Sequence, residues 1–473
     1  MSKLKFTISL RAVSVFLLLL FSSQGSYAIP SFARQMGVSC AACHTNAFGP
    51  ALNSIGRQFK ESGYTLGDSN KFPPLSVMLV APSFTHANKD VPGPSSPFEK
   101  NNNVTADELG LFYGGKFFTS DLVNAGGFIQ ATYEPLADAI AWDNVDIKLT
   151  HDFLLPYGQS KNTNSAENHA VTFGISLNNS PTAQDPWNTT PTWGFPYVGS
   201  PVEDLPGPPG DATPMISNLG QTVGGATAYA VVNDVIPNSG WNAYVEGGAY
   251  ASLSPGFQRT MGVLGSDTAD ELDGGAPYWR LAIERQSPHT YMEMGHYGFI
   301  ANIFPGRDHT AGTDRYTDLA IDGTFEYFPA DENTHNFQLW GTVIWEDQKL
   351  NASQALGNTA NRNSSLTTYN ITGSYTYKQT YQVNLGYFAS SGSTDPVLWS
   401  NPSGNPDSDG LIMELDYTPF GKDDSLYAPY LNVRLALQYV AFFNYLGRSS
   451  NYDGTGRNAS DNNTLLLNAW FAF

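Results

Sequence analysis

The sequence predicts an all-β transmembrane barrel of about 16 antiparallel strands, preceded by a small α-helical domain. Segments of about ten residues, in which apolar and polar side chains alternate, recur from Leu75 to the last residue. Tyrosine and phenylalanine are abundant, with 25 and 28 residues, and many lie near strand ends, where membrane barrels carry aromatic girdles. The alternation continues to Phe473, so the chain stops on an aromatic residue within a strand. Outer-membrane barrels commonly end in this way.

Residues 1–28 are typical of a signal peptide. Three positive side chains precede an apolar stretch at 12–21, and Ser26-Tyr27-Ala28 is a small-x-small cleavage pattern. The stretch is too short and wrongly flanked for a stable membrane span. We therefore expect an exported protein whose mature chain starts at Ile29 and whose destination is the bacterial outer membrane.

The charge balance excludes one class of partner. The chain has 24 Lys and Arg against 43 Asp and Glu, a net charge of −19. An acidic chain of this size is not a nucleic-acid binder by electrostatics, because it repels phosphates. It would attract cations instead.

The run Cys40-Ala41-Ala42-Cys43-His44 carries the clearest chemical signal. C-x-x-C-H is the attachment signature of a c-type haem. Two thiols at this spacing bond the two vinyl groups of one porphyrin, and the histidine reaches the iron. A disulfide or a redox C-x-x-C is the alternative, but a redox site does not need the histidine. The chain has 2 cysteines, Cys40 and Cys43, so we expect one covalent haem c with His44 as the proximal ligand.

Residues 29–74 are predicted to form this small monohaem cytochrome c domain. One short helix is expected over 50–62, with Leu52, Ile55 and Phe59 on one face and Gly63 as a C-terminal cap. So few apolar residues cannot support an independent core, and a bound porphyrin would supply the missing apolar mass.

Two cations on that helix leave two interpretations open. Arg57 and Lys60 could meet the haem propionates, or they could be solvated charges on an amphipathic helix.

Residues 75–473 are predicted to form the barrel. Short turns and long loops alternate along most of it, as periplasmic turns and external loops do; the connections near 155–167 and 135–138 break this rhythm. The longest connection, 181–225, could fold into the pore, stand over it or be an ordinary mobile loop. The strands are expected to begin near residues 75, 106, 122, 139, 168, 226, 240, 278, 290, 316, 335, 365, 381, 410, 427 and 462.

The alternation also predicts which side chains line the barrel interior, or lumen. Five acidic residues share lumen parity: Asp318, Asp322, Glu326, Glu414 and Asp416. They would concentrate divalent cations by electrostatic focusing. Alternatively, they are the ordinary polar lining of any porin, balanced by Arg280 and Arg434.

The sixth ligand of the haem iron has three candidates. Met36 lies just before the motif, and Met78 and His86 lie on the first strand with the same parity. A methionine would raise the potential relative to a histidine. We favour Met78 among these candidates as the distal ligand, and the alternative that it is an ordinary strand residue stays open.

The segments Ile29–Gln35, Cys40–His44, Gly56–Lys60 and Gly63–Leu66 resemble the amino-terminal cytochrome of the fused outer-membrane cytochrome–porin family of iron-oxidising bacteria. The carboxyl-terminal segments resemble the same family: Gly410 to Phe420, Asn432 to Tyr439, Asn451 to Gly454 and Asn463 to Phe473.

The resemblance implies an Fe(II)-oxidising cytochrome c oxidoreductase. It would accept electrons from extracellular Fe(II) through one haem c held by Cys40, Cys43 and His44. A periplasmic c-type cytochrome or a similar carrier would be the next acceptor. Two other readings stay open: a solute porin gated or plugged by its cytochrome domain, and an extracellular electron conduit with another donor or acceptor.

Overall fold

The computed structural model describes residues 29–67, 74–90, 100–135, 138–159, 166–200, 212–263, 266–331, 333–425, 427 and 431–473. The expected signal peptide, residues 1–28, lies outside the described residues.

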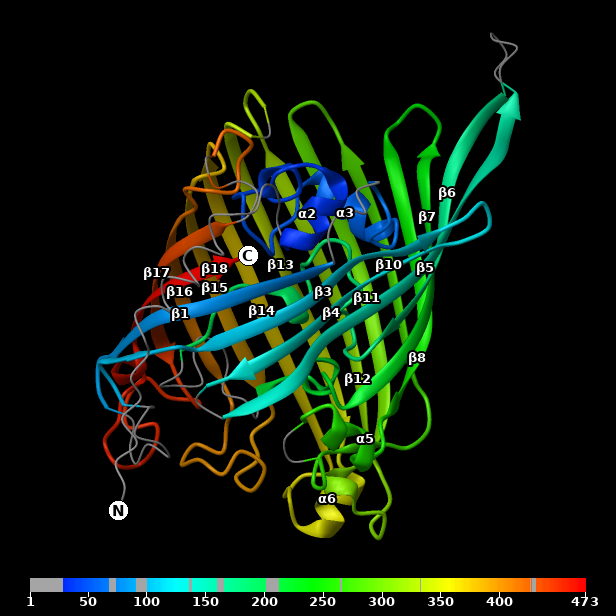
Figure 1. Ribbon diagram of the computed structural model, residues 1–473. Helices are drawn as coiled ribbons and strands as arrows, with labels where there is room; N and C mark the ends of the chain where they lie inside the picture. Colours follow the sequence, from blue (N-terminus) through cyan, green and yellow to red (C-terminus); the bar gives the residue numbers. More distant parts are fainter. Residues whose placement is uncertain are drawn as a thin grey trace, which may run out of the picture.

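Within this part of the chain, sixteen long strands close into one antiparallel barrel (Figure 1). Closure occurs where β1 pairs with both β18 and β3. The long strands are β1 (Leu75–Ala87), β3 (Glu108–Thr119), β4 (Asn124–Glu134), β5 (Ala139–Gln159), β6 (Ala166–Asn178), β7 (Val223–Ile236), β8 (Trp241–Ser252), β10 (Ala276–Gln286), β11 (Thr290–Phe304), β12 (Asp314–Tyr327), β13 (His335–Lys349), β14 (Asn363–Tyr377), β15 (Tyr381–Gly392), β16 (Ser408–Tyr417), β17 (Asn432–Asn444) and β18 (Thr464–Ala472). Two short strands add to the sheet: β2 (Asn103–Thr105) pairs with β1, and β9 (Glu271–Leu272) pairs with β11. The predicted barrel is thus confirmed, and the largest offset is at β17, expected near 427.

The helices are short. They are α2 (Pro30–Met36), α3 (Ser54–Glu61), α4 (Met215–Asn218), α5 (Pro255–Thr260) and α6 (Asn351–Leu356), with 3₁₀ turns η1 (Cys40–Ala42), η2 (Pro191–Trp193), η4 (Pro305–Arg307) and η5 (Ala459–Asn462). Among the described residues, none of the helices has the length and apolar character needed to cross a bilayer.

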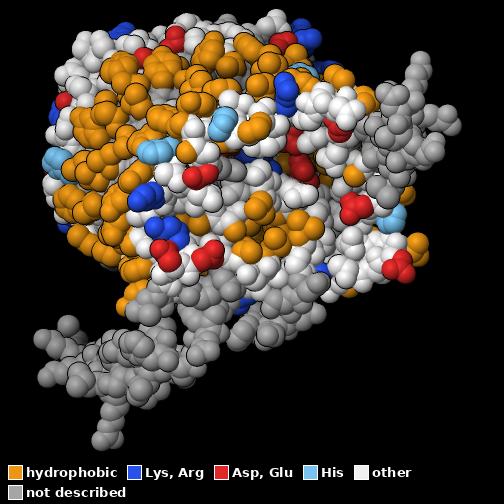
Figure 2. Space-filling view, turned by 90° about the horizontal axis from the view of Figure 1, so that it is seen from above, with side chains coloured by type: hydrophobic (Ala, Val, Ile, Leu, Met, Phe, Trp, Pro, Cys, Tyr) orange, Lys and Arg blue, Asp and Glu red, His pale blue; other side chains and the backbone are white. Residues whose placement is uncertain are grey.

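The strand register sends apolar side chains outward and acidic ones into the lumen. On β12, Leu319 and Ile321 are 43% and 49% exposed, whereas the alternating Asp318 and Asp322 are buried. Viewed from one end, hydrophobic side chains gather along the flank of the barrel (Figure 2). An apolar outer face around a polar interior is the arrangement of a barrel that spans a lipid bilayer.

The two ends of the barrel differ. Short turns, such as 237–240 and 378–380, share one end, and long connections, such as 253–275 and 393–407, share the other. The connection near 155–167 looked too long for a turn, but β5 and β6 extend into it and leave 160–165 between them. Helices α2 and α3 lie at the short-turn end, opposite α5 and α6 (Figure 1). Short turns mark the periplasmic end of such barrels.

The predicted helix over 50–62 is shorter than expected. Asn53 caps it, because its side chain accepts hydrogen bonds from the backbone N–H groups of Ile55 and Gly56, and α3 begins at Ser54. Gly63 has a φ of +72° just after the helix end, as expected of a C-terminal cap. Phe59 is buried, but Ile55 is 45% exposed, so the apolar face is narrower than the sequence indicated.

Candidate functional site

Residues 29–67, hereafter the plug, are docked inside the barrel rather than beside it. Wall side chains bond to its backbone on several sides. Tyr229 Oη donates to Glu61 O (2.7 Å), Gln379 Nε2 to Ala41 O (2.7 Å), Asn432 Nδ2 to Ala47 O (2.6 Å) and Thr418 Oγ1 to Asn46 O (2.6 Å). The four donors lie on β7, in the β14–β15 turn, just after β16 and on β17. The barrel wall therefore contacts the plug from several sides and supplies the packing that so small a segment cannot supply for itself.

The C-x-x-C-H run is folded as one tight turn. The N–H groups of Cys43 and His44 both donate to Cys40 O, at 3.1 and 3.0 Å. Helix α3 packs directly on this turn, because a Cβ at Gly56 would collide with Cys43 O. The two cysteines form no disulfide in the described structure, and burial raises the pKa of Cys40 to about 12 and that of Cys43 to about 11.

His44 is oriented as a metal ligand would be. Its Nδ1 lies 3.0 Å from Ala51 O. A carbonyl oxygen only accepts, so Nδ1 carries the proton and Nε2 is left with its lone pair. Burial lowers the pKa of His44 to about 4, so the ring is neutral at pH 7. A neutral imidazole whose other nitrogen is held by a carbonyl is the usual arrangement of a histidine that binds a metal.

A cavity of about 390 Å³ lies between the plug and the wall. Its volume falls in the range of small-molecule and cofactor sites. Cys43, His44, Met36 and Met78 all line it. Nine aromatic side chains line it: Phe32, Phe48, Phe59, Tyr64, Phe112, Phe128, Trp193, Tyr197 and Trp470. Polar side chains line it as well, among them the carboxylates of Glu108 and Asp143. The thiol of Cys43, the imidazole and the thioethers predicted from the sequence therefore meet at one cavity.

Cys40 differs from the other motif residues, because it does not line this cavity. It is buried against Ala33, which does. The Cys40 thiol therefore lies behind the first layer of the cavity wall.

His86 is not a lumen residue. The prediction that it shares the parity of Met78 is wrong, because the register of β1 shifts between Val80 and Ser83. This β-bulge reverses the alternation, and His86 is exposed, with Nδ1 2.7 Å from Asn102 Oδ1. Met78 and Met36 remain at the cavity.

Neither Arg57 nor Lys60 is a solvated charge. Arg57 is buried, and its Nη1 lies 2.7 Å from Glu326 Oε1 on β12; it does not line the cavity. Lys60 does line it, and donates to Asn188 Oδ1 at 2.9 Å. Burial lowers the pKa of Lys60 to about 7, and the positive charge of the nearby Lys148 contributes a smaller part of this shift.

A further polar group at the cavity was not singled out from the sequence. The indole N–H of Trp470, on β18, is buried at the wall and has no hydrogen-bond partner among the described residues. The alternation of the terminal strand already places Trp470 on the lumen face, but it does not show that the indole meets this cavity.

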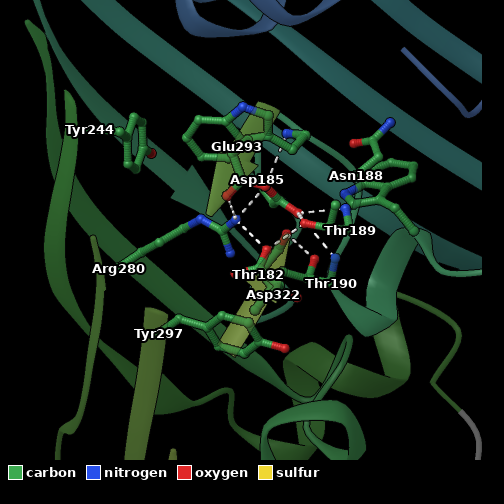
Figure 3. A network of polar contacts seen from close by, with 12 residues as sticks. Thr182, Asp185, Asn188, Thr189, Thr190, Tyr244, Arg280, Glu293, Tyr297 and Asp322 are labelled. Atoms are coloured by element: carbon green, nitrogen blue, oxygen red, sulfur yellow. Dashed lines mark hydrogen bonds and ion pairs between the residues drawn. The ribbon is translucent and has the colours of Figure 1, made fainter. Parts of the chain in front are cut away.

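The long connection between β6 and β7 folds into the lumen, the first of the three alternatives. Its described parts, 179–200 and 212–222, are hereafter the inward loop. Asp185 binds the N–H groups of Trp187, Thr189 and Thr190 at 3.0–3.1 Å, and its carboxylate faces Arg280 (Figure 3). Burial by itself would raise the pKa of Asp185. The positive charge of Arg280 and, to a smaller extent, that of Lys60 outweigh this effect and hold the pKa of Asp185 below its usual range.

The inward loop also reaches the plug. Asn188 accepts from Lys60 and donates to Pro50 O at 2.7 Å, and Trp193 lines the cavity. The loop therefore runs from the wall at Arg280 to the plug.

The five predicted lumen acids are indeed buried, and arginines pair with most of them. Arg434 pairs with Glu414 and with Asp416, the latter at 2.8 Å. Arg280 Nη2 lies 2.5 Å from Asp322 Oδ2. Among the described residues, no three or more His, Cys, Asp or Glu side chains are grouped as a metal site.

No family model and no curated protein matches the chain. Similar solved structures include OmpT, an outer membrane protein of Vibrio cholerae (10% identity, TM-score 0.44, 84% of this chain and 98% of that chain). Others are the outer membrane channel DcaP of Acinetobacter baumannii (12%, 0.39, 84% and 96%) and an anion-selective porin from Comamonas acidovorans (12%, 0.39, 84% and 99%). The barrel assignment itself rests on the strand pairing described above.

Proposed function

We propose that this chain is a fused outer-membrane cytochrome–porin that oxidises extracellular Fe(II). In this proposal the barrel spans the bacterial outer membrane, and one haem c is held in the plug. Electrons taken from Fe(II) pass inward to a periplasmic c-type cytochrome or a similar carrier. The observation that carries the proposal is the convergence of Cys43, His44 and Met78 on one cavity inside the barrel.

Most of the residues that a c-type haem needs lie at the cavity. Cys43, which lines it, and Cys40, which lies behind its wall, would hold the porphyrin covalently, and His44 would bind the iron through Nε2. Met78, favoured from the sequence, or Met36 would supply the thioether on the distal side. A bound haem supplies a one-electron redox centre. Each Fe(II) then loses one electron to become Fe(III), and one carrier molecule gains it.

The chain's own residues would tune that centre. Lys60 and the unpaired indole N–H of Trp470 both line the cavity and would be available as donors to the haem carboxylates. The hydrogen bond from His44 Nδ1 to Ala51 O fixes the tautomer that leaves Nε2 available as a ligand.

The position of the cavity suits the proposed direction of electron flow. The plug lies at the short-turn end, which faces the periplasm in barrels of this type. A soluble carrier would therefore meet the molecule on the side of the haem. The donor would arrive from the long-loop end, so that ferric product forms outside the cell.

Anaerobic mixing tests the proposal. The haem-loaded, oxidised protein in detergent is mixed with Fe(II), and the haem absorption bands are followed. We expect rapid conversion to the reduced spectrum. Reduction by dithionite but not by Fe(II) would overturn iron as the donor.

The plugged-porin alternative has one observation in its favour, since the plug and the inward loop both occupy the lumen. Single-channel recording tests it. A plugged barrel should pass little current, and a solute porin must show openings when the plug is released.

A further inference from the structure

One part of the cavity wall is polar and carries negative charge. Glu108 on β3, Gln130 on β4 and Asp143 on β5 all line the cavity. The three strands are neighbours in the sheet, so these three side chains, hereafter the polar patch, lie on one side of it. Each of them carries oxygen, the ligand atom that hard divalent cations prefer.

The amide of Gln130 is held in one orientation. Its Nε2 donates to Glu108 Oε1 at 3.3 Å and to Thr132 Oγ1 at 3.1 Å. Thr132 Oγ1 in turn donates to Asp143 Oδ2 at 3.3 Å. Gln130 is 9% exposed, and its carbonyl oxygen accepts no hydrogen bond from any described residue. A buried acceptor without a donor is costly, so this oxygen at the cavity wall points to an electron-poor ligand.

The polar patch has no positive partner. The charges that act most strongly on Glu108 are those of three other acids, Asp143, Glu134 and Asp107. The strongest charge acting on Asp143 is that of Glu134. Within the described part of the chain, no lysine, arginine or histidine forms an ion pair with Glu108 or Asp143. Carboxylates withdrawn from bulk water without a counter-charge are costly, so a cation at this wall would be favourable.

We propose that Glu108, Gln130 and Asp143 bind a divalent cation, the electron donor, within the haem cavity. Two carboxylates, one amide oxygen and water are a sufficient ligand set for such an ion. An ion with its water shell, at about 30 Å³ for each water, fits within the cavity of about 390 Å³. The identity of the natural cation rests on the proposed function, which makes it Fe(II). Each bound Fe(II) would give one electron to the oxidised haem and leave as Fe(III).

The polar patch lies on the outer side of the haem ligands. β3 runs from the long-loop end to the short-turn end, so Glu108 lies nearer the outside than Phe112. Met78, the favoured distal ligand, pairs with Gly110, midway between those two residues. Two residues of strand span about 7 Å. A donor that enters from outside would therefore meet the polar patch about one strand repeat before the level of Met78.

Binding of Mn²⁺, followed by electron paramagnetic resonance of the purified full chain in detergent at about 0.15 M salt, tests the site directly. Salt at this level screens weak surface binding. We expect one tight site, weakened at least tenfold by Glu108→Gln and by Asp143→Asn. The matched control is Glu134→Gln, which removes the same charge from an exposed neighbour that does not line the cavity. It should change the affinity by less than about twofold, because an exposed charge is screened by salt.

Both site variants are nearly isosteric, and heat-modifiable mobility on gels verifies that each variant barrel has folded. Should one of them fail to fold, the other decides the question. Absence of a tight Mn²⁺ site in the unaltered protein would overturn the inference. A site that either folded variant leaves unchanged, or that Glu134→Gln weakens equally, would also overturn it.

The haem reaction separates this inference from the proposed function. In the haem-loaded protein we expect Glu108→Gln to raise the Fe(II) concentration for half-maximal reduction rate at least tenfold, with reduction by a neutral hydroquinone little changed. A tight Mn²⁺ site in a protein that Fe(II) never reduces would uphold the cation site and reject Fe(II) oxidation. Fe(II) reduction without any Mn²⁺ site would do the reverse.

Discussion

Removing Arg57 should release the plug from the barrel. The Arg57 guanidinium lies 2.7 Å from Glu326 Oε1, both side chains are buried, and its centre lies 3.5 Å from the centre of the Tyr291 ring. Arg57→Met leaves Glu326 buried with only Asn336 as a donor, at 2.9 Å. Breaking a buried pair from one side costs about 3–5 kcal/mol. Each 1.4 kcal/mol changes an equilibrium constant tenfold, so the equilibrium population of the released plug should rise at least about a hundredfold.

Planar-bilayer recording measures that release as channel openings, and limited proteolysis of the plug measures it independently. The matched control is Arg57→Met with Glu326→Gln, which removes both charges and should recover most of the closed state. Equal open probability in the unaltered protein and the single variant would refute the reasoning. A double variant as open as the single one would also refute it, because lost packing rather than the unpaired charge would then be the cause.

Three other predictions follow from the cavity. Met78→Ala should change the ligand-field spectrum of the loaded protein and lower its potential; an unchanged spectrum points to Met36, and Met36→Ala is the matched test. Lys60 has a pKa of about 7 when folded, against an ordinary lysine pKa of 10.5, so it is harder to protonate in the folded state. The free energy of unfolding of the haem-free protein should therefore rise between pH 7 and 10.5, by up to about 5 kcal/mol. Denaturant titrations should show no such rise in Lys60→Met. Gly56→Ala forces a Cβ against Cys43 O and should cost about 1–3 kcal/mol. A haemochrome assay should then show less covalent haem, whereas Gly256→Ala, which adds a Cβ in open space on α5 at an ordinary backbone φ, should not lower haem attachment.

The barrel was predictable because each of its strands is specified by residues that are adjacent in the sequence. Period-two alternation identified each strand and placed Asp318, Asp322 and Glu326 on the lumen face, where the structure has them. Where the alternation is interrupted, the prediction failed. His86 was assigned inward because parity was counted through Pro82, and the bulge there reverses it. A proline inside a strand was the available signal.

The contacts that build the site were not predictable, since they join residues far apart in the chain. Nothing near Arg57 indicates Glu326, 269 positions away, and nothing near Asp185 indicates Arg280. The choice between an inward and an outward loop depends on such pairs. The C-x-x-C-H spacing is local, so the motif could be recognised in the sequence, but the partners of Lys60 could not.

The most direct test of the account is electron transfer across a membrane. Haem-loaded protein is reconstituted into vesicles that enclose an oxidised c-type cytochrome, and Fe(II) is added outside under anaerobic conditions. The account predicts that the enclosed cytochrome is reduced, and that vesicles carrying the Cys43→Ala, His44→Ala variant leave it oxidised. An enclosed cytochrome that stays oxidised while the haem of the barrel becomes reduced would contradict the proposed path from the outer face to the periplasm.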